Sequence, residues 1–234
     1  MNSTNPIPLE SDFNWWWYKA KNNYLKELTK LYVSKNNNLN ILEIGPGLGN
    51  NLSNLNQFGV VDILEVEKEF INYNMEKNRK LIRNIFTSLD SVDLKYDLVI
   101  LLDVLEHIKD TDKFLGKIKK ICKDGSYLIV STPAFMSLWS NHDISLNHFR
   151  RYTLKTLKED LSPWFKIKKF YGMNYTLLPV RYFQIKFLKS PNTLKESDLI
   201  NNVLYLISLV EYFLLKLKIN IPWGISIFTI CQNE

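Results

Sequence analysis

Cysteine and histidine are both scarce in this sequence. Its 234 residues include two cysteines, Cys122 and Cys231, and three histidines. Two cysteines cannot build a disulfide framework. Two of the histidines fall in one loop, without cysteine partners and without the i, i+4 helical spacing of a zinc site. We therefore expect no metal centre.

The sequence also lacks a charged-then-apolar leader, an internal repeat and a concentrated block of charge. The missing leader favours a cytoplasmic location. The formal net charge of +6 comes from lysines and arginines spread along the chain, which favours a solvated basic surface over a nucleic-acid partner. With 46% hydrophobic residues the chain can build one substantial core, and we expect a single domain over residues 1–234.

Short apolar runs alternate with helical patterns from residue 39 onward, an order typical of βαβ units in a parallel sheet. The apolar runs predict seven strands, at residues 40–44, 60–64, 84–86, 97–102, 127–130, 167–171 and 225–230. The periodic segments between them predict helices at residues 51–57, 68–77, 104–121 and 153–161. Thr153 is the expected N-cap of the last of these helices.

Two segments lie outside this alternation. An amphipathic stripe predicts an N-terminal helix within residues 12–35. The span 172–223 is too long for a turn between two strands, and we expect a helical insertion there, with patterns at 175–188 and 198–218. The second pattern has these apolar residues on one side: Leu199, Val203, Leu206, Ile207, Val210, Phe213, Leu214 and Leu217. That side either packs on the core, or belongs to a lid that meets an apolar acceptor or a membrane surface.

The strongest chemical signal is a glycine-rich turn between the first strand and the next helix. Gly45, Gly47 and Gly49 are spaced G-x-G-x-G, with Glu43 two residues upstream. Glycines let the chain turn sharply and let a ligand approach the backbone, although an ordinary tight turn is the alternative. Glu65 follows the second strand, where a carboxylate can accept hydrogen bonds from both hydroxyls of a ribose. The glycine spacing favours a single nucleoside with a charged tail over a dinucleotide.

These residues resemble the class I S-adenosylmethionine-dependent methyltransferases over about residues 39–130. The family's fourth-strand motif looks like residues 96–108, and its fifth-strand entry looks like 123–126, with one glycine retained. The resemblance implies S-adenosylmethionine as cofactor. It also implies an α/β, Rossmann-like, seven-stranded, mostly parallel sheet with an antiparallel last strand. No Asn-Pro-Pro-aromatic run is present, which disfavours amino methylation of nucleic acid.

A narrower resemblance extends over nearly the whole chain, to bacterial methyltransferase-domain proteins associated with surface polysaccharide or lipid-linked glycan synthesis. It rests on an aromatic N-terminal run and four later segments, at residues 15–17, 132–134, 138–143, 148–153 and 221–226. The resemblance implies a small-molecule, carbohydrate or lipid-linked acceptor, with oxygen as the expected methylated atom.

The family's donor-site roles carry over residue by residue. By resemblance, Glu43 and the backbone of Gly45 and Gly47 face the methionine end of the donor. Gly49 completes the cofactor loop, and Glu65 holds the ribose.

The remaining donor contacts leave alternatives open. Ser88 and Leu89 are the expected adenine edge, with Asp90 as a competitor. Asp103 is expected beside the methionine portion of the donor, and its alternative role is to cap the helix that follows the fourth strand.

The acceptor side depends on the loop at residues 132–153, which follows the fifth strand at the carboxyl edge of the sheet. Polar and aromatic residues are concentrated in this loop: Trp139, His142, Asp143, His148, Arg150, Arg151 and Tyr152. His142, oriented by Asp143, and His148 are candidate catalytic bases, and the alternative is that both pack the loop.

The other residues of this loop are predicted acceptor contacts: Trp139, Arg150, Arg151 and Tyr152. The two arginines would pair with a phosphate or carboxylate of the acceptor, or with a carboxylate of the protein such as Asp143.

Two other functions fit parts of the pattern. A catalytically silent S-adenosylmethionine-binding or scaffold protein would keep the glycine loop without an organised acceptor loop. A nicotinamide-dependent oxidoreductase would need a different glycine spacing. We therefore predict a methyltransferase that is cytoplasmic, with peripheral membrane contact as an option, and the sequence leaves the acceptor and the oligomeric state open.

Overall fold

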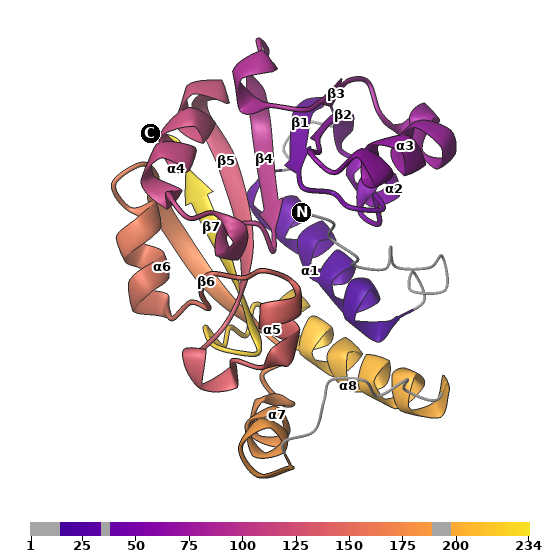
Figure 1. The fold of residues 1–234 in the computed structure, drawn as a ribbon, viewed down its shortest axis with the longest axis vertical. Coiled ribbons are helices and arrows are strands. Elements are labelled where there is room, and N and C mark those ends of the chain that lie inside the picture. The colour runs from indigo at the N-terminus through magenta and orange to yellow at the C-terminus, as the bar shows by residue number, and fades with distance from the viewer. Residues whose placement is uncertain (1–14, 34–37, 189–197) are drawn as a thin grey trace.

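The computed structural model describes residues 15–33, 38–188 and 198–234, and it contains one seven-stranded sheet flanked by helices (Figure 1). The strands are β1 (Leu39–Ile44), β2 (Gly59–Leu64), β3 (Ile85–Phe86), β4 (Tyr96–Leu102), β5 (Cys122–Pro133), β6 (Lys166–Met173) and β7 (Ser226–Gln232). Their order across the sheet is β3-β2-β1-β4-β5-β7-β6. All seven predicted strands are confirmed, and β5 begins earlier than predicted.

The strand order reverses between β1 and β4, and this reversal determines where a ligand can bind. β1 pairs in parallel with β2 on one side and with β4 on the other, whereas β7 runs antiparallel to β5 and β6. The loops that follow β1 and β4 leave the same edge of the sheet in different directions. Open α/β sheets bind ligands at such a point. The glycine loop and the segment after β4 therefore border one site.

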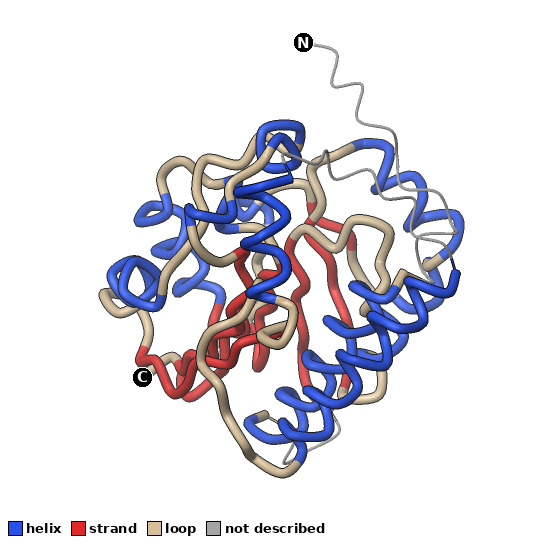
Figure 2. The backbone as a smooth tube through the Cα atoms, turned by 90° about the horizontal axis from the view of Figure 1, so that it is seen from below, coloured by secondary structure: helices blue, strands red, loops and turns tan. Residues whose placement is uncertain are grey.

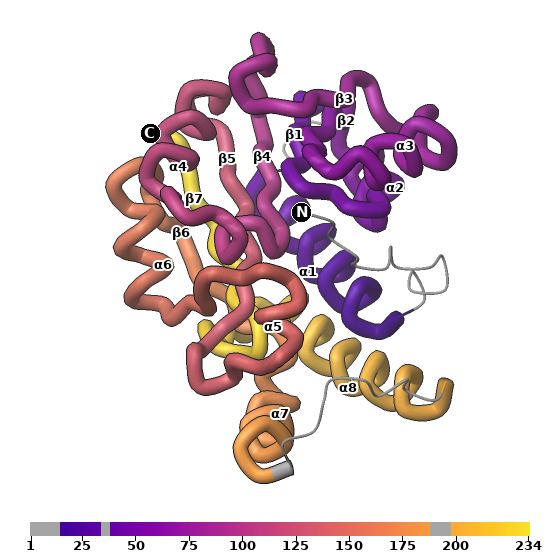
Figure 3. The backbone as a smooth tube through the Cα atoms, in the orientation of Figure 1, coloured from indigo at the N-terminus to yellow at the C-terminus, as the bar shows by residue number. Residues whose placement is uncertain are grey.

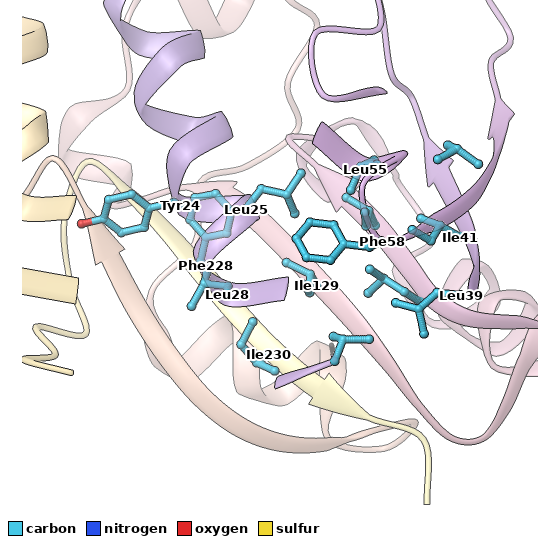
Figure 4. Close-up of a cluster of buried hydrophobic side chains, with 14 of the residues drawn as sticks. Tyr24, Leu25, Leu28, Leu39, Ile41, Leu55, Phe58, Ile129, Phe228 and Ile230 are labelled. Atoms are coloured by element: carbon cyan, nitrogen blue, oxygen red, sulfur yellow. The ribbon is translucent and has the colours of Figure 1, made fainter. Parts of the chain in front are cut away.

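Alternate residues of the central strands face two hydrophobic clusters, one on each side of the sheet. On β1, Ile41 belongs to one cluster and Leu42 to the other. Figure 2 shows the strands as a central layer between helices. In the first cluster the ring of Tyr24, from the N-terminal helix, stacks on Phe228 of β7 with centroids 5.7 Å apart (Figure 4). The first helix and the last strand are thus parts of one core.

The helices are α1 (Trp16–Tyr32), α2 (Leu52–Leu55), α3 (Lys68–Lys77), α4 (Thr111–Ile121), α5 (Asn141–Ser145), α6 (Leu154–Leu161), α7 (Leu178–Phe183) and α8 (Asp198–Lys216). Thr153 caps α6 as predicted, since its side chain accepts from the N–H of Thr156. The helix predicted at 104–121 is wrong in its first part. A 3₁₀ turn at Leu105–His107 precedes α4, which begins after its own N-cap, Asp110. Predicted segments at 12–14, 34–37 and 189–197 lie outside the described residues.

The insertion between β6 and β7 consists of α7, a π-helical turn at Gln184–Leu188, and α8. α8 lies along α1 (Figure 1). Most of the apolar side predicted for this helix is exposed: Leu199, Val203, Leu206, Val210, Phe213 and Leu217. The alternative in which that side packs on the core is therefore wrong.

α8 packs against the rest of the protein through Leu215, which is buried in the first hydrophobic cluster, and through polar residues. Glu211 is buried, and its carboxylate accepts from the N–H groups of Asn174 at 2.6 Å and Thr176 at 2.9 Å. The Thr176 hydroxyl donates to the same carboxylate at 2.6 Å. Near the other end of the helix, Oδ1 of Asn201 accepts from the N–H of Trp16 at 2.8 Å. These directional bonds determine which side of α8 faces inward.

Replacing Glu211 should loosen this attachment. In Glu211→Ala, two backbone N–H groups and a hydroxyl lose their acceptor, and we expect the free energy of unfolding to fall by about 2–4 kcal/mol. Urea denaturation measures this change. The matched control is Glu69→Ala, an exposed acid on α3, for which we expect a change within about 0.5 kcal/mol. Equal stability of the two variants would show that Glu211 does not hold α8.

Candidate active site

The glycine loop after β1 follows a left-handed backbone course. Gly45, Gly47 and Gly49 have φ angles of +67°, +56° and +77°. Such angles suit glycine, which has no Cβ. Two side-chain amides hold the loop: Asn74 of α3 donates to the carbonyl of Gly47 at 2.7 Å, and Asn78, the C-cap of α3, donates to the carbonyl of Leu48 at 2.9 Å. The loop is therefore shaped by the protein itself.

The three glycines differ in what a side chain would meet. A Cβ at Gly47 would have no heavy atom within 4 Å, so this backbone borders open space that a ligand can enter. A Cβ at Gly45 would lie 3.0 Å from Cγ2 of Val104, after β4. A Cβ at Gly49 would lie 2.6 Å from Asn74, which means that glycine is required there for packing. A donor contact by Gly49 stays a prediction.

Glu65 follows β2, and its carboxylate faces the glycine loop. One carboxylate oxygen accepts from the N–H of Gly47 at 3.1 Å, and the other accepts from the N–H groups of Val66 at 2.8 Å and Glu67 at 3.1 Å. Burial raises the pKa of Glu65, although these three donors oppose the rise. The side chain is thus held at the rim of the open space beside Gly47, where the predicted ribose contact requires it.

The two neighbouring acids of the sequence, Asp62 and Glu67, have other surroundings. Asp62 is fully buried and accepts hydrogen bonds from the Arg83 guanidinium and the Tyr96 hydroxyl. Glu67 is exposed at the start of α3. Of these three acids, Glu65, the predicted ribose contact, is therefore the one that faces the glycine loop.

Glu43, near the end of β1, is almost fully buried. Its Oε1 accepts from the amide of Asn51 at 2.6 Å, and within the described residues its Oε2 has no hydrogen-bond partner. Burial raises the pKa of Glu43 to about 7, the Asn51 hydrogen bond opposes the rise, and the charge of Glu65 adds to it. A buried carboxylate oxygen without a partner is a natural acceptor for a cationic group, such as the amino group of a methionine moiety.

A pocket of about 340 Å³ opens beside the ends of β2 and β3. It is lined by Leu64, Val66, Thr87, Ser88, Leu89, Asp110, Lys113, Phe114 and Lys117. Ser88 and Leu89, the predicted adenine edge, are both in this lining, whose apolar walls suit a flat base. The competitor, Asp90, pairs instead with Lys117 at 2.7 Å and is largely exposed. The geometry therefore favours Ser88 and Leu89 over Asp90.

Asp103 follows β4 and has a left-handed backbone, with φ of +55°. Its carboxylate accepts from the Ser131 hydroxyl at 2.9 Å and pairs with Lys21, a buried lysine of α1. The alternative in which Asp103 caps the following helix is wrong, because Asp110 caps α4. Non-glycine residues with positive φ are strained and cluster at functional sites, which fits a functional role for Asp103.

The acceptor loop is organised around Asp143, a fully buried residue of α5. Its carboxylate accepts from Arg151 at 2.7 Å and 3.1 Å, and one of its oxygens lies 3.0 Å from Nδ1 of His148. Burial opposes ionisation of Asp143, yet hydrogen bonds from His148 and Arg151 outweigh burial and hold its pKa well below the ordinary value. The carboxylate of Asp143 thus contacts His148, and the orientation of His142 by Asp143 stays a prediction.

Three side chains form a cluster beside this loop: Glu106, His107 and His148. Their ligand atoms lie within 4.8 Å of one another, and the two imidazole rings meet edge to face at 4.6 Å. Figure 3 shows the chain after β4 passing beside α5, where the N–H of Phe149 donates to the carbonyl of Glu106 at 2.8 Å. A carboxylate and two imidazoles suit a divalent cation as donors, and the expectation of no metal stays a prediction.

Glu106 is fully buried, and neither of its carboxylate oxygens has a hydrogen-bond partner in the part of the chain that the structure describes. Burial raises the pKa of Glu106 well above its ordinary value, and the charge of Asp103 adds to the rise, whereas Lys21 and Arg151 oppose it. Glu106 therefore lies between the groups of the donor side and those of the acceptor loop.

The remaining predicted acceptor residues are mostly engaged within the protein. Tyr152 is buried and its hydroxyl donates to Asp160 at 3.1 Å, so an acceptor contact by Tyr152 has no support in the geometry. Arg150 donates to the backbone carbonyls of residues 108 and 109. Trp139 is half-buried, and His142 is exposed. Acceptor contacts by Arg150 and Trp139 stay predictions, and so does the role of His142 as a candidate base.

Sequence reasoning missed Lys21 and did not assign a role to Glu106. Lys21 was detectable, since it lies four residues after Trp17 and four before Leu25 on the apolar stripe of α1. A lysine on such a stripe needs a partner, and here the partner is Asp103. Glu106 carries no comparable signal, because its burial depends on a loop folding over it.

These features fit S-adenosylmethionine as the ligand. The backbone at Gly47 is open, Glu65 offers a carboxylate beside it, and Glu43 has a buried oxygen to accept an amino group. The apolar pocket beside Ser88 can take a base.

The open space at Gly47 leads to a test of donor binding. Gly47→Val fills that space, and we expect the free energy of donor binding to weaken by on the order of 1–3 kcal/mol. We expect a loss of the same size, on the order of 1–3 kcal/mol, for Glu65→Ala, which removes the carboxylate that accepts hydrogen bonds from the ribose hydroxyls. Isothermal titration measures both. The control for the first is Gly125→Val near the amino end of β5, which has φ of +74° and equally open surroundings. The control for the second is Glu69→Ala. Unchanged affinity in folded Glu65→Ala would refute its assignment.

The raised pKa of Glu43 predicts a pH dependence. The ionised carboxylate should bind the donor's amino group, so donor affinity should rise as the pH increases through about 7. Below that value the affinity should fall by up to about tenfold per pH unit. Titration calorimetry across pH measures the slope. Glu43→Gln should remove it, and a slope that survives in Glu43→Gln would belong to another group.

The chain is similar to known methyltransferases in sequence. The methyltransferase-domain family matches residues 9–166, which is more than half of the chain. Ubiquinone biosynthesis O-methyltransferase of Rickettsia bellii is 30% identical over an alignment of 117 residues, and the alignment covers 47% of this chain and 48% of that protein. The corresponding protein of Rickettsia typhi is 29% identical over 115 residues, with 47% of each chain covered. The chain thus spans about half the length of the curated relatives it matches.

Solved structures share the fold at low identity. Phosphoethanolamine N-methyltransferase 2 of Haemonchus contortus, in complex with S-adenosylmethionine, is 16% identical with a TM-score of 0.61, covering 99% of this chain and 58% of that one. N-methyltransferase NodS of Bradyrhizobium japonicum, in complex with S-adenosylhomocysteine, is 13% identical with a TM-score of 0.59, covering 99% and 94%. By its match to the family model over more than half of its length, the chain belongs to the methyltransferase-domain family.

Proposed function

We propose that this protein is an S-adenosylmethionine-dependent methyltransferase that methylates an oxygen atom of a small-molecule or lipid-linked acceptor, with His148 as the base that removes the acceptor's proton. The observation that carries the proposal is the contact between Nδ1 of His148 and the buried carboxylate of Asp143 at 3.0 Å. An ionised carboxylate favours the tautomer with the proton on Nδ1. Nε2 is then the basic nitrogen of His148.

Asp143 can fix the tautomer of His148 because other donors stabilise its ionised carboxylate. Arg151 donates to both of its oxygens, and the N–H of Ser140 donates to one of them at 2.9 Å. These donors keep Asp143 ionised beside His148. Asp143 and Arg151 are therefore positioning residues in this proposal, rather than groups that bind the acceptor.

When bound, S-adenosylmethionine supplies a methyl group on a positively charged sulfur, so much of the rate comes from alignment with the acceptor. The protein's part is to hold the donor at Glu43, Gly47 and Glu65, and to hold the acceptor's oxygen beside His148. An amine acceptor that is already unprotonated needs no such base, whereas a hydroxyl must lose its proton. An arranged carboxylate–histidine pair favours the hydroxyl.

The names of the matched relatives support an apolar acceptor. The Rickettsia proteins are described as O-methyltransferases of ubiquinone biosynthesis. The likeness to proteins of surface polysaccharide or lipid-linked glycan synthesis stays a prediction, and a carbohydrate hydroxyl is the alternative oxygen acceptor. We also propose a cytoplasmic location.

A catalytically silent S-adenosylmethionine-binding protein is the competing proposal. A silent protein has no need of a base, so the pairing of the buried Asp143 carboxylate with His148 argues against it. S-adenosylhomocysteine release with a panel of phenols, sugar alcohols and amines separates the two proposals. Release with no member of the panel, under conditions where the donor binds, would favour the silent protein.

The base assignment is tested with the acceptor found in this way. We expect His148→Ala to lower kcat by about 10²–10⁴-fold, because the acceptor's proton then has no acceptor in the protein, while the donor Kd stays unchanged. His142→Ala is the matched control in the same loop, and we expect a much smaller loss. Equal turnover of His148→Ala and the wild-type protein would rule out His148, and a loss confined to His142→Ala would move the role to that residue.

A further inference from the structure

α8 presents an uninterrupted apolar stripe to the outside of the protein. Its residues recur at intervals of four and three: Leu199, Val203, Leu206, Val210, Phe213 and Leu217. This spacing puts them on one side of a helix. Their exposed fractions lie between 46% and 74%, so the stripe is open along its whole length. A soluble protein normally turns such a side inward.

The outward orientation of the stripe is built into the packing of α8. Glu211 and Ser208, on the opposite side, are buried, and three hydrogen bonds hold the Glu211 carboxylate. Rotating the helix to bury the stripe would break these bonds and bring a carboxylate to the surface. The hydrogen bonds of Glu211 therefore hold the apolar stripe in its outward orientation, where it is available to a binding partner.

Exposed apolar and aromatic side chains continue in the rest of the insertion. On α7 and the turn after it they are Val180, Tyr182, Phe183 and Phe187, and after α8 they are Ile219 and Trp223. The insertion therefore exposes more apolar residues than the narrow seam that a pair of helices buries. Aromatic residues mixed with aliphatic ones are typical of helices that lie in the interface of a bilayer.

The charges of the insertion favour an anionic partner. Residues 175–188 and 198–223 contain four basic residues and two acidic ones, which are Arg181, Lys186, Lys216, Lys218, Asp198 and Glu211. Glu211 is buried, whereas Lys186, Lys216 and Lys218 are exposed. The exposed charge around the apolar surface is therefore mostly positive, in a chain whose formal charge is +6. Anionic lipid head groups complement this charge.

We propose that this surface docks on an anionic lipid bilayer, with α8 lying in the plane of the interface. Its 19 residues and mean hydropathy of 1.4 would suffice to cross a membrane, but the buried contacts of Glu211 keep the helix on the protein. The proposal deepens the proposed function, since a bilayer is where an apolar or lipid-linked acceptor resides. It also connects to the site, because α1, on which α8 lies, carries the Lys21 that pairs with Asp103.

A flotation assay with the full chain tests this proposal. The vesicles are phosphatidylcholine alone, and phosphatidylcholine mixed with phosphatidylglycerol, each at low and at high salt. We expect flotation with the anionic vesicles at low salt and weaker flotation at high salt, because salt screens the lysines. The double variant Leu206→Ser/Phe213→Ser should lower partitioning about tenfold or more, because both side chains leave the apolar surface. The matched control, Met75→Ser on α3, removes an equally exposed apolar residue elsewhere and should float like the wild-type protein.

Three outcomes would overturn the proposal. The first is a wild-type protein that stays in the soluble fraction with anionic vesicles at low salt. The second is an equal loss in Met75→Ser and the double variant, whose folding is checked by circular dichroism. The third is a dimer in sedimentation velocity that the double variant dissolves, without vesicle binding, which would make a second copy the occupant. Donor titration on the same samples is independent, so a failure of the methyltransferase proposal and a failure of membrane docking can be told apart.

Discussion

The parallel pairing of β1 with β4 is the constraint on which the site depends. In this register Ile44 is opposite Leu101, so Gly45 and Asp103 emerge within two residues of the same level of the sheet. The close approach of Val104 to Gly45 shows how near the two loops come. Gly47 follows β1, Glu65 follows the neighbouring strand β2, and Asp103 follows β4, so these donor-side residues all lie at one edge of the sheet. A shift in this pairing would separate the glycine loop from the groups after β4.

Buried charges connect this edge to the acceptor loop. Lys21 pairs with Asp103, and Arg151 pairs with Asp143. The charges of Asp103, Lys21 and Arg151 all shift the pKa of Glu106. Such groups are tolerated in the interior only when they compensate one another. Three acids near the donor side have no cationic partner among the described residues, namely Glu43, Glu65 and Glu106, and the cationic donor would enter beside them. Glu43 and Glu106 are held neutral more readily than ordinary carboxyls, and each can ionise in response to a nearby cation.

Much of the fold could be predicted because its signals are local. The seven strands follow from apolar runs, and Gly47 and Glu65 follow from turn chemistry at the ends of strands. The break before α4 was missed because apolar residues continue through Val104 and Leu105 with helical spacing, while Asp110 provides the actual cap. The periodicity of α8 predicts that the helix has an apolar side, but it does not predict whether that side faces the core or the solvent. The pairing of Asp143 with His148 depends on how the loop closes after α5, which no local pattern encodes.

The position of β7 affects how the chain is made. β7 lies between β5 and β6, and β6 has no other partner among the described strands. During synthesis, β6 therefore emerges with nothing to pair with, and β5 remains an open edge, until the residues of β7 leave the ribosome. Pairings between distant parts of a chain form slowly, and unpaired edges invite association with other chains. The nascent protein thus passes through a stage in which two strands of its own core are exposed, and its yield in a cell depends on how well that interval is protected.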